Sequence, residues 1–207
     1  MRVLRYGSRA VLVELAGLEQ VAGLHTALRH QPLHGVLELV PAARTLLVRF
    51  DPGVTGLARL TAELTALAPR EAATVEADQV VIPVRYDGVD LAEVARQSGL
   101  SPAQVIARHT AAEYRVAFGG FAPGFAYLTG VDPALRMPRR ATPRTRVPAG
   151  ALALADGFTA VYPRESPGGW QLIGSTELTL WDPAADPPSR LTPGTAVRFV
   201  ETAVPAL

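Results

Sequence analysis

The distribution of proline is the feature that most limits how this chain can fold. Of the 18 prolines, six precede residue 120 and twelve follow it. Proline removes a backbone donor and clashes with the preceding helical turn, so helix interiors exclude it. We therefore expect long helices only in the first half, and short segments between turns in the second half.

The first half predicts a mixed α/β arrangement. Apolar residues at helical spacing predict helices over residues 17–29 and 55–68. Short apolar runs predict strands over residues 10–15, 36–40, 45–50 and 79–86. Strands mixed with two amphipathic helices predict a small two-layer α+β domain that ends near residue 80.

Two capped helices are predicted next. Asp90 and Glu93 have the spacing of a capping box, and Gly99 is placed to end that helix. Ser101 and Gln104 form a second capping box, with proline at the first helical position between them. This second helix is expected to run to about residue 112.

From residue 114 onward, short apolar runs alternate with glycine and proline. The runs cover residues 115–118, 151–155, 159–162, 170–173, 178–181 and 196–200. Several short strands between turns predict a barrel or a sandwich.

The composition excludes several kinds of site. Because the chain has no cysteine, it has no disulfide, thiolate nucleophile or cysteine-ligated metal. All 20 basic residues are arginine, which excludes a Schiff-base lysine, a phosphate-binding Walker lysine and a lysine that carries biotin or pyridoxal phosphate. The net charge of +1 gives no support for a nucleic-acid binder. No apolar run is long enough to span a membrane, so we expect a cytoplasmic protein.

Two segments have compositions that suit a binding site. Residues 118–128, FGGFAPGFAYL, combine glycines and a proline with four aromatic residues. Such a loop can bring backbone N–H groups close to a ligand, but a barrel turn whose aromatic side chains fill the core has the same composition. Residues 136–150 contain five arginines, which suit carboxylate or phosphate groups, and an exposed charged face is the alternative.

A third segment, residues 161–174, contains a tight turn at Ser166-Pro167-Gly168-Gly169. A nucleophilic serine needs a nearby base. The only histidine in the latter three-quarters of the chain, His109, shares a helix face with Val105 and Ile106, where a histidine usually packs in the core. The other three histidines do not share a helical face or a carboxylate cluster, so no metal site is predicted.

These motifs and their order in the chain resemble those of the family of the B subunit of prokaryotic ATP-dependent 5-oxoprolinase. That family also includes the sporulation kinase inhibitor and proteins labelled allophanate hydrolase subunit 1. The resemblance is strong over residues 80–205 and limited to layout before them. It rests on His109-x4-Tyr114, residues 120–128, Pro138-Arg139, Pro143-Arg144, residues 147–150, Tyr162-Pro163, residues 166–174 and Pro193-Gly194.

The chain departs from the family pattern at two places. Ala126 stands where the family usually has proline, and Phe158-Thr159-Ala160 stands where Gln-Thr-Gly is usual. The loss of a glutamine removes a polar group, and alanine allows fewer backbone conformations than glycine. We therefore expect these changes to alter the chemistry of the pocket and its choice of substrate.

The resemblance implies an α+β ferredoxin-like domain over residues 1–80, followed by a mainly β cyclophilin-like barrel over residues 81–207 of the carboxyltransferase subdomain C/D type. It implies a subunit that is inactive alone and hydrolyses 5-oxo-L-proline to L-glutamate with a companion barrel subunit and a third subunit. ATP would activate the lactam carbonyl by phosphorylation before water attacks, and a partner subunit could hold the ATP.

Two other functions fit the same motifs. One is a binding regulator that inhibits a sensor histidine kinase. The other is a carboxyl-transfer subunit of the urea carboxylase or allophanate hydrolase type, for which biotin would have to come from another chain.

The expected site is a groove between the aromatic loop, the Arg144 region and the glycine turn. Arg144 is expected to bind a carboxylate or a phosphate, and His109 and Tyr127 to orient the substrate. The other expected substrate-binding residues are Phe121, Pro123, Gly124, Phe125, Tyr162, Ser166, Gly168, Gly169 and Trp170. For each of these residues, a packing role is the alternative.

Overall fold

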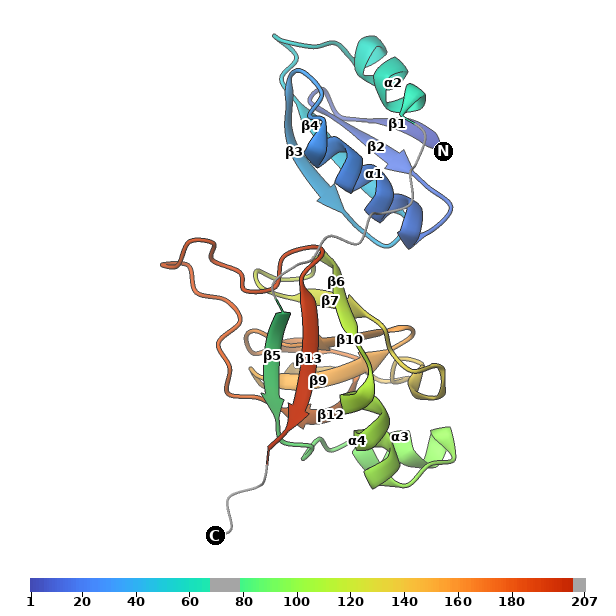
Figure 1. Cartoon of the computed structure of the whole chain (residues 1–207), viewed down its shortest axis with the longest axis vertical. Helices are drawn as coiled ribbons and strands as arrows, with labels where there is room; N and C mark the ends of the chain where they lie inside the picture. Colours follow the sequence, from blue (N-terminus) through green and yellow to red (C-terminus); the bar gives the residue numbers. More distant parts are fainter. Residues whose placement is uncertain (68–78, 203–207) are drawn as a thin grey trace. The chain divides into compact units, whose positions relative to one another are not determined.

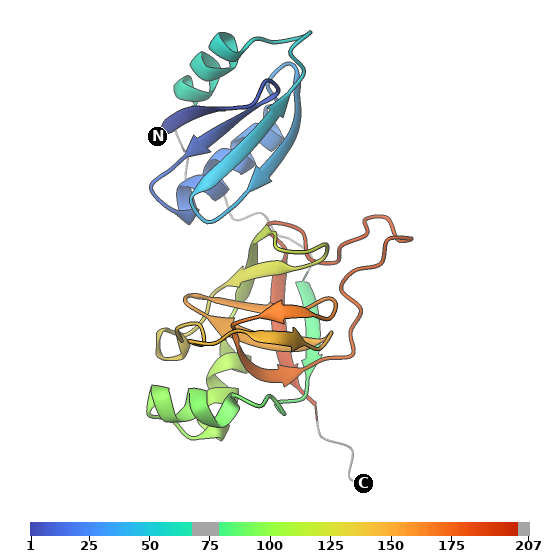
Figure 2. The same cartoon turned by 180° about the vertical axis from the view of Figure 1, so that it is seen from behind.

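The computed structural model describes residues 1–67 and 79–202, which separate into two compact units. The N-terminal unit is a four-stranded antiparallel sheet, in the order β1-β2-β4-β3, with two helices. Its elements are β1 (Arg2–Tyr6), β2 (Ala10–Glu14), α1 (Leu18–His30), β3 (Val36–Pro41), β4 (Thr45–Phe50) and α2 (Leu57–Ala66). Helix α1 lies in front of the sheet in Figure 1 and behind it in Figure 2.

A single apolar core joins both helices to one face of this sheet. Its buried residues come from alternate positions of β2 and β4 and from one face of each helix: Val11, Val13, Leu46, Val48, Leu24, Leu28, Leu60 and Leu64. The predicted helices and strands of this unit are confirmed, although α2 ends at Ala66. Strand β1 was not predicted, because its mostly exposed residues, two of them arginine, carry no clear apolar period.

The C-terminal unit is a seven-stranded, nearly closed barrel in the order β12-β9-β10-β7-β6-β13-β5. Its strands are β5 (Gln79–Val84), β6 (Tyr114–Gly119), β7 (Ala126–Thr129), β9 (Ala151–Ala155), β10 (Phe158–Val161), β12 (Gln171–Ser175) and β13 (Ala196–Glu201). The two ends of the sheet meet where Arg85 and Ser175 exchange backbone hydrogen bonds of 2.8 and 2.7 Å. The predicted barrel is therefore confirmed.

Strand β5 belongs wholly to this barrel, where it pairs in parallel with β13. The expected boundary near residue 80 falls beside residues 68–78, which lie outside the described residues. The run at residues 178–181 was wrongly predicted to be a strand. Only Trp181 there makes an isolated bridge, to Ser189, and Leu180 is buried, so the apolar residues serve packing rather than a sheet.

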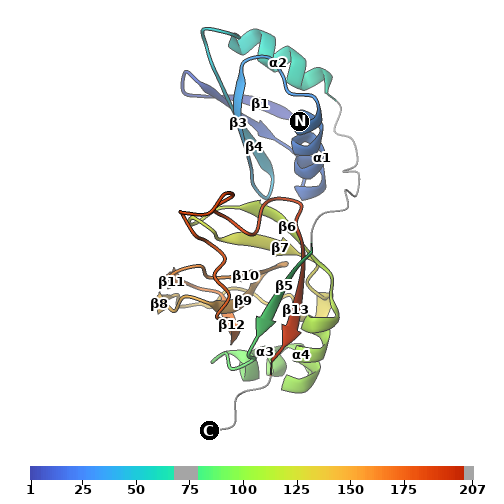
Figure 3. The same ribbon diagram turned by 60° about the vertical axis from the view of Figure 1, so that its left-hand side comes forward.

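Strands β9 and β10 are buried on both faces. Leu152 and Leu154 of β9 point into the barrel core, whereas Ala151, Ala153 and Ala155 belong to a second apolar cluster on the other face. The ribbon formed by β8 (Arg144–Val147) and β11 (Ser166–Gly168) lies outside β9 and β10 (Figure 3). The candidate site forms in this outer layer.

Helices α3 (Leu91–Ser98) and α4 (Pro102–Ala111) pack against β12 and β13, and a 3-10 turn, η1 (Pro133–Leu135), lies beside α3. The capping box of α4 is confirmed, because Ser101 Oγ accepts from the Gln104 backbone and Gln104 Oε1 accepts from the Ser101 backbone. Gly99 ends α3 in the left-handed conformation, as predicted. Within residues 1–67 and 79–202, no helix is long and apolar enough to cross a membrane.

Candidate functional site

The glycine-rich connection between β6 and β7 starts with a strained three-residue turn. The backbone N–H of Ala122 donates to Gly120 O at 2.7 Å, and Phe121 between them has a φ of +66°. A non-glycine residue in such a turn is rare and strained, and strain of this kind is often found at functional sites. The turn leaves the Phe121 side chain 59% exposed at the tip of the loop.

A second turn follows at once. The backbone N–H of Phe125 donates to Ala122 O at 3.0 Å, with Pro123 and Gly124 at the centre of the turn. Gly124 has a φ of +78°, which is the requirement of a type II turn with proline before it. A Cβ at Gly124 would lie only 2.4 Å from the Cβ of Trp181, so glycine also allows the loop to pack closely there.

Four aromatic side chains form a cluster on the outer face of the barrel. Phe125 packs edge to face against Tyr162 at 5.2 Å and Trp170 at 5.7 Å between ring centroids, and Tyr127 lies 5.6 Å from Trp170. We call Phe125, Tyr127, Tyr162 and Trp170 the aromatic cluster. Phe121 extends it to the surface, with its ring 6.3 Å from that of Tyr162. The structure therefore brings together five of the predicted site residues.

The floor of the aromatic cluster consists of small residues. Ala153, Ala155 and Ala160 are buried beneath it. Gly168 lies against the Tyr162 hydroxyl, because a Cβ there would be 2.2 Å from the Tyr162 oxygen. Small side chains at these positions leave room for the large rings to lie on the sheet.

We expect Gly168→Ala to lower the free energy of unfolding by roughly 1–3 kcal/mol, since the added methyl group forces the buried Tyr162 ring to move. Gly169→Ala is the matched control. Its Cβ would meet Pro143 at an ordinary 3.6 Å, so a change within about 0.5 kcal/mol is expected. Urea unfolding followed by tryptophan fluorescence measures both. Equal effects of the two substitutions would contradict the close packing of Gly168 on Tyr162.

The two phenols of the aromatic cluster differ in their exposure, because Tyr162 is buried and Tyr127 is half-buried. Burial raises the pKa of Tyr127 and of Tyr162, and the nearby charge of Arg139 opposes both rises. Both hydroxyls are therefore protonated at neutral pH. The Tyr162 hydroxyl is buried against Gly168, so of the two only the half-buried Tyr127 can donate to an oxygen of a ligand.

The predicted ligand-binding arginine, Arg144, is held by a carboxylate of the protein. Asp90 Oδ1 accepts from Arg144 Nη2 and from Arg140 Nη1, each at 2.7 Å, and Asp90 Oδ2 accepts from the Leu172 backbone at 2.7 Å. Asp90 is only 3% exposed. Arg144 therefore anchors the basic segment to β12, which differs from the expected role of binding a substrate carboxylate.

The same contacts correct the predicted capping box at Asp90. Asp90 is the N-cap residue of α3, but its side chain makes no capping hydrogen bond. Glu93 instead pairs with Arg96 and Gln97 within the helix. The Asp90 carboxylate accepts hydrogen bonds from the two arginines and from Leu172 instead of from the first turn of α3, as the sequence pattern had predicted.

His109 is fully buried in the barrel core, on the opposite side of the sheet from the aromatic cluster. Its ring packs on Tyr114 and Phe199, with centroids at 5.1 and 4.7 Å. Nδ1 lies 2.8 Å from the Tyr86 hydroxyl, and Nε2 lies 3.2 Å from Thr159 Oγ1. Both ring nitrogens are thus occupied, and the burial of His109 favours the packing role that was the alternative to orienting a substrate.

The other predicted residues of the turn are structural neighbours of the site. Ser166 pairs with Val147 in the outer ribbon, and its hydroxyl donates to Arg164 O at 3.3 Å. In the part of the chain that the structure describes, no histidine or carboxylate forms a hydrogen bond with Ser166, so it has no base. The same described residues contain no group of three or more histidine, aspartate or glutamate side chains that could hold a metal ion.

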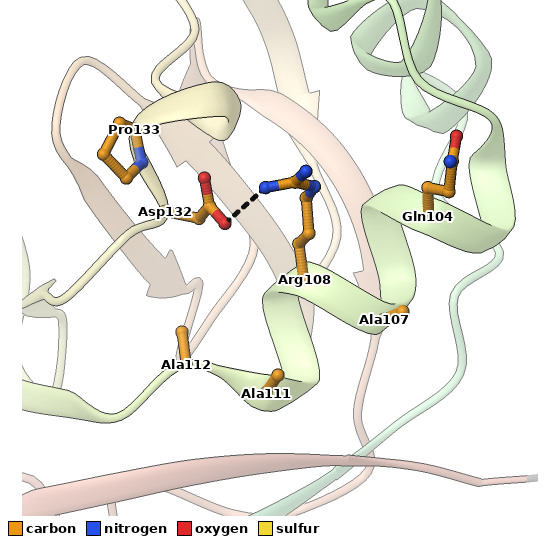
Figure 4. A pocket seen from close by; sticks show the side chains of 7 residues that line it. All are labelled: Gln104, Ala107, Arg108, Ala111, Ala112, Asp132 and Pro133. Carbon is orange, nitrogen blue, oxygen red and sulfur yellow. Dashed lines mark hydrogen bonds and ion pairs between the residues drawn. The ribbon is translucent and has the colours of Figure 1, made fainter.

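A separate pocket of about 530 Å³ lies on the outside of α4 (Figure 4). Arg108 and Asp132 form an ion pair of 3.0 Å across it. Its lining contains none of the predicted site residues: Gln104, Ala107, Arg108, Ala111, Ala112, Asp132 and Pro133. We place the candidate site at the aromatic cluster, because the strained turn at Phe121 and five of the predicted site residues meet there.

Comparison with known proteins gives both a family and relatives. The model of a family described as carboxyltransferase domain, subdomain C and D, matches residues 1–191. The B subunit of 5-oxoprolinase from Bacillus subtilis (strain 168) is 39% identical over 201 residues, which are 88% of this chain and 84% of that protein. The corresponding B subunit from Escherichia coli O157:H7 is 51% identical over 133 residues, which are 63% of this chain and 61% of that protein.

Solved structures show the same similarity. The crystal structure of TTHA0988 is 41% identical, with a TM-score of 0.79 over 96% of this chain, but only 41% of that longer chain is covered. A conserved uncharacterized protein, PH0987 from Pyrococcus horikoshii, is 37% identical with a TM-score of 0.59 over 97% of both chains. The Kluyveromyces lactis urea carboxylase, at 21% identity and a TM-score of 0.73, covers 97% of this chain with 22% of its own and shares the fold.

Proposed function

Because the chain belongs to the family of the carboxyltransferase domain, subdomain C and D, and its curated relatives are 5-oxoprolinase B subunits, we propose that it is a subunit of an ATP-dependent 5-oxoprolinase. The complex would hydrolyse 5-oxo-L-proline to L-glutamate. The observation that carries this proposal is the 39% identity to the Bacillus subtilis protein over 88% of this chain.

The proposed enzyme needs partners for ATP chemistry. This chain has no lysine to contact phosphates, and it has no glycine-rich phosphate loop of the Walker type. We propose that ATP is held by a partner subunit, that a companion barrel subunit and a third subunit complete the enzyme, and that this chain is inactive alone. The relatives are themselves named as subunits, which supports an assembly.

In this assembly the exposed edge of the aromatic cluster would bind the lactam ring. The exposed ring of Phe121 suits the ring methylenes, and the half-buried Tyr127 can donate a hydrogen bond to the lactam oxygen. Phe158, at the position where the family usually has glutamine, packs edge to face on Tyr127 at 5.7 Å and makes this wall apolar. A hydrogen bond to the carbonyl oxygen favours attack at the carbonyl carbon, because it stabilises the charge that develops on the oxygen.

The N-terminal unit is proposed to be a ferredoxin-like variant. In a β-α-β-β-α-β layout, the last strand pairs with the first strand at an edge of the sheet. Here β2, α1, β3, β4 and α2 supply the first five elements, and β1 pairs with β2 at that edge. The strand order β1-β2-β4-β3 supports this assignment, with the edge strand supplied by the start of the chain.

The proposed function is tested by glutamate release from 5-oxo-L-proline. The tagged chain is captured with its partners from its own cells and assayed with and without ATP, and the isolated chain is the control. We expect ATP-dependent glutamate from the captured complex and none from the isolated chain.

Other outcomes of this assay would contradict the proposal. ATP-dependent turnover by the isolated chain would remove the need for partners. A complex that contains a histidine kinase, or a biotin-bearing partner, and releases no glutamate would favour the regulator or the carboxyl-transfer function.

A further inference from the structure

The sheet of the N-terminal unit carries a row of apolar side chains on the face that its helices leave open. The row crosses all four strands, because Leu4 of β1 pairs with Leu12 of β2, which pairs with Leu47 of β4. Leu47 in turn pairs with Val40 of β3. All four residues lie outside the core that joins α1 and α2 to the sheet, and we call them the apolar row. The open face is turned toward the viewer in Figure 2, where α1 lies behind the sheet.

The apolar row is accessible from solvent. Leu4 and Val40, at its two ends, are 37% and 39% exposed, and the two leucines between them are half-buried. Tyr6, two residues after Leu4 on the same face, is 61% exposed. The solvated face of an antiparallel sheet usually carries polar side chains. A band of apolar side chains across that face is therefore a surface suited to contact with another protein.

Two ion pairs lie on the open face, one on each side of the apolar row. Arg2 of β1 pairs with Glu14 of β2 at 3.0 Å, and Arg49 of β4 pairs with Glu38 of β3. The four strands therefore present balanced charge on this face. A partner surface that is apolar and balanced in charge fits it better than an acidic or a basic one.

The placement of the two ion pairs makes the open face complementary to itself. The first ion pair shares its side of the row with Thr45 of β4, and the second shares its side with Ala10 of β2 and Tyr6 of β1. A two-fold axis in the plane of the contact, either along the strands or across them, lays the apolar row of one copy on that of another. In both cases each ion pair meets these uncharged residues, so like charges do not face each other.

We propose that the open face of the N-terminal sheet is the contact surface of a symmetric dimer of this chain. Four strands spaced about 4.8 Å apart, with five residues of about 3.3 Å each, give a face of roughly 300 Å² per copy. An interface of this size lies at the low end for specific complexes, so the dimer exchanges with monomers at micromolar concentrations. The dimer does not rest on the proposed function, because the N-terminal unit contains none of the residues of the candidate site.

The test is sedimentation equilibrium of the isolated full-length chain at concentrations from about 5 to 500 µM, which bracket the expected dissociation constant. We expect the average mass to rise from that of one chain toward that of two chains as the concentration increases. A chain that stays monomeric over this range overturns the proposal and leaves the open face to a different protein.

Val40→Lys places a charge at one end of the apolar row. In a symmetric dimer both copies carry the substitution, so two ammonium groups would meet apolar side chains, and we expect the dissociation constant to rise about 10-fold or more. Leu4→Lys, at the other end of the row, should have the same effect. Val54→Lys is the matched control, because this valine of the same unit is 44% exposed but lies in the turn after β4. Its dissociation constant should stay within about twofold of wild type.

Salt separates this apolar contact from an electrostatic one. Raising sodium chloride from about 0.1 to 1 M should leave the wild-type dimer at least as stable, because apolar association is not screened. Far-ultraviolet circular dichroism checks that each variant keeps its sheet, and the two wild-type measurements need no substitution. The proposal is overturned by a dimer that dissociates at high salt, by a dimer that both Val40→Lys and Leu4→Lys leave intact, or by an equal loss in Val54→Lys.

Discussion

Asp90→Ala is expected to lower the free energy of unfolding of the C-terminal unit by about 3–5 kcal/mol. The substitution removes one buried carboxylate that two arginines and the Leu172 backbone share. Two guanidinium groups would then lie side by side without a counter-charge, and a buried N–H would lose its acceptor. Removal of one partner from a buried ion pair costs far more than the net stabilisation by the pair.

The matched control is Asp87→Ala, three residues earlier. The Asp87 side chain is about half exposed, pairs with Arg85 at 3.7 Å and accepts from the Ser175 hydroxyl at 2.8 Å. Because these contacts are exposed to solvent, a loss of about 1 kcal/mol is expected. Both tryptophans, Trp170 and Trp181, belong to the C-terminal unit, so tryptophan fluorescence in urea reports on this unit alone. Similar losses in the two variants would show that Asp90 does not support the basic segment.

The stability of the C-terminal unit is also expected to fall by about 2 kcal/mol between pH 7 and pH 5 because of His109. Burial lowers the pKa of His109 from 6.5 to about 3. The unfolded chain therefore binds a proton below pH 6.5 that the folded unit does not bind. The contribution of neutral His109 to the free energy of unfolding is fully present above pH 6.5. It falls by about 1.4 kcal/mol per pH unit as the pH drops from 6.5 toward 3.

The hydrogen bonds of His109 explain why the folded unit excludes this proton. Thr159 Oγ1 donates to Ala153 O at 3.1 Å, so it accepts from Nε2–H of His109, and Nδ1 is left to accept from the Tyr86 hydroxyl. A proton on Nδ1 would break the bond to Tyr86 and place a charge in the core. The neutral ring with Nε2–H is the form that fits.

His109→Gln tests this account, because glutamine keeps a donor and an acceptor but does not titrate. The stability difference between wild type and variant should shrink by about 2 kcal/mol from pH 7 to pH 5. The measurement is urea unfolding followed by tryptophan fluorescence at several pH values. Because His25, whose pKa burial also lowers, lies in the N-terminal unit, it does not contribute to this signal. A constant difference across this pH range would refute the buried neutral histidine.

Local sequence patterns were sufficient for most elements of the fold. Ser101, Pro102 and Gln104 define the start of α4 by contacts within four residues, and the structure reproduces each of them. The alternation of alanine and leucine at residues 151–155 predicts β9, where both faces are buried. Strand β11, Ser166–Gly168, lacked such a signal, because it is three residues long and holds a proline and a glycine.

The candidate site divides in the same way. The composition of residues 118–128 indicated an aromatic loop that could form a binding site. The two turns of this loop depend on glycine and proline within the segment. No signal in the sequence indicated that Arg140 and Arg144 share one carboxylate. Asp90, their common partner, lies 50 and 54 residues away from them along the chain.

The sequence by itself determined most of the secondary structure, the barrel and the family, because these follow from local spacing and from motifs in a given order. Only the tertiary structure decided which charged groups pair with one another. Asp90 looks like a helix cap and Arg144 like a ligand-binding arginine until the fold brings them together. A carboxylate binds whichever donors the fold places nearest, and that distance is set by the packing of β12 against α3 rather than by neighbours in the chain.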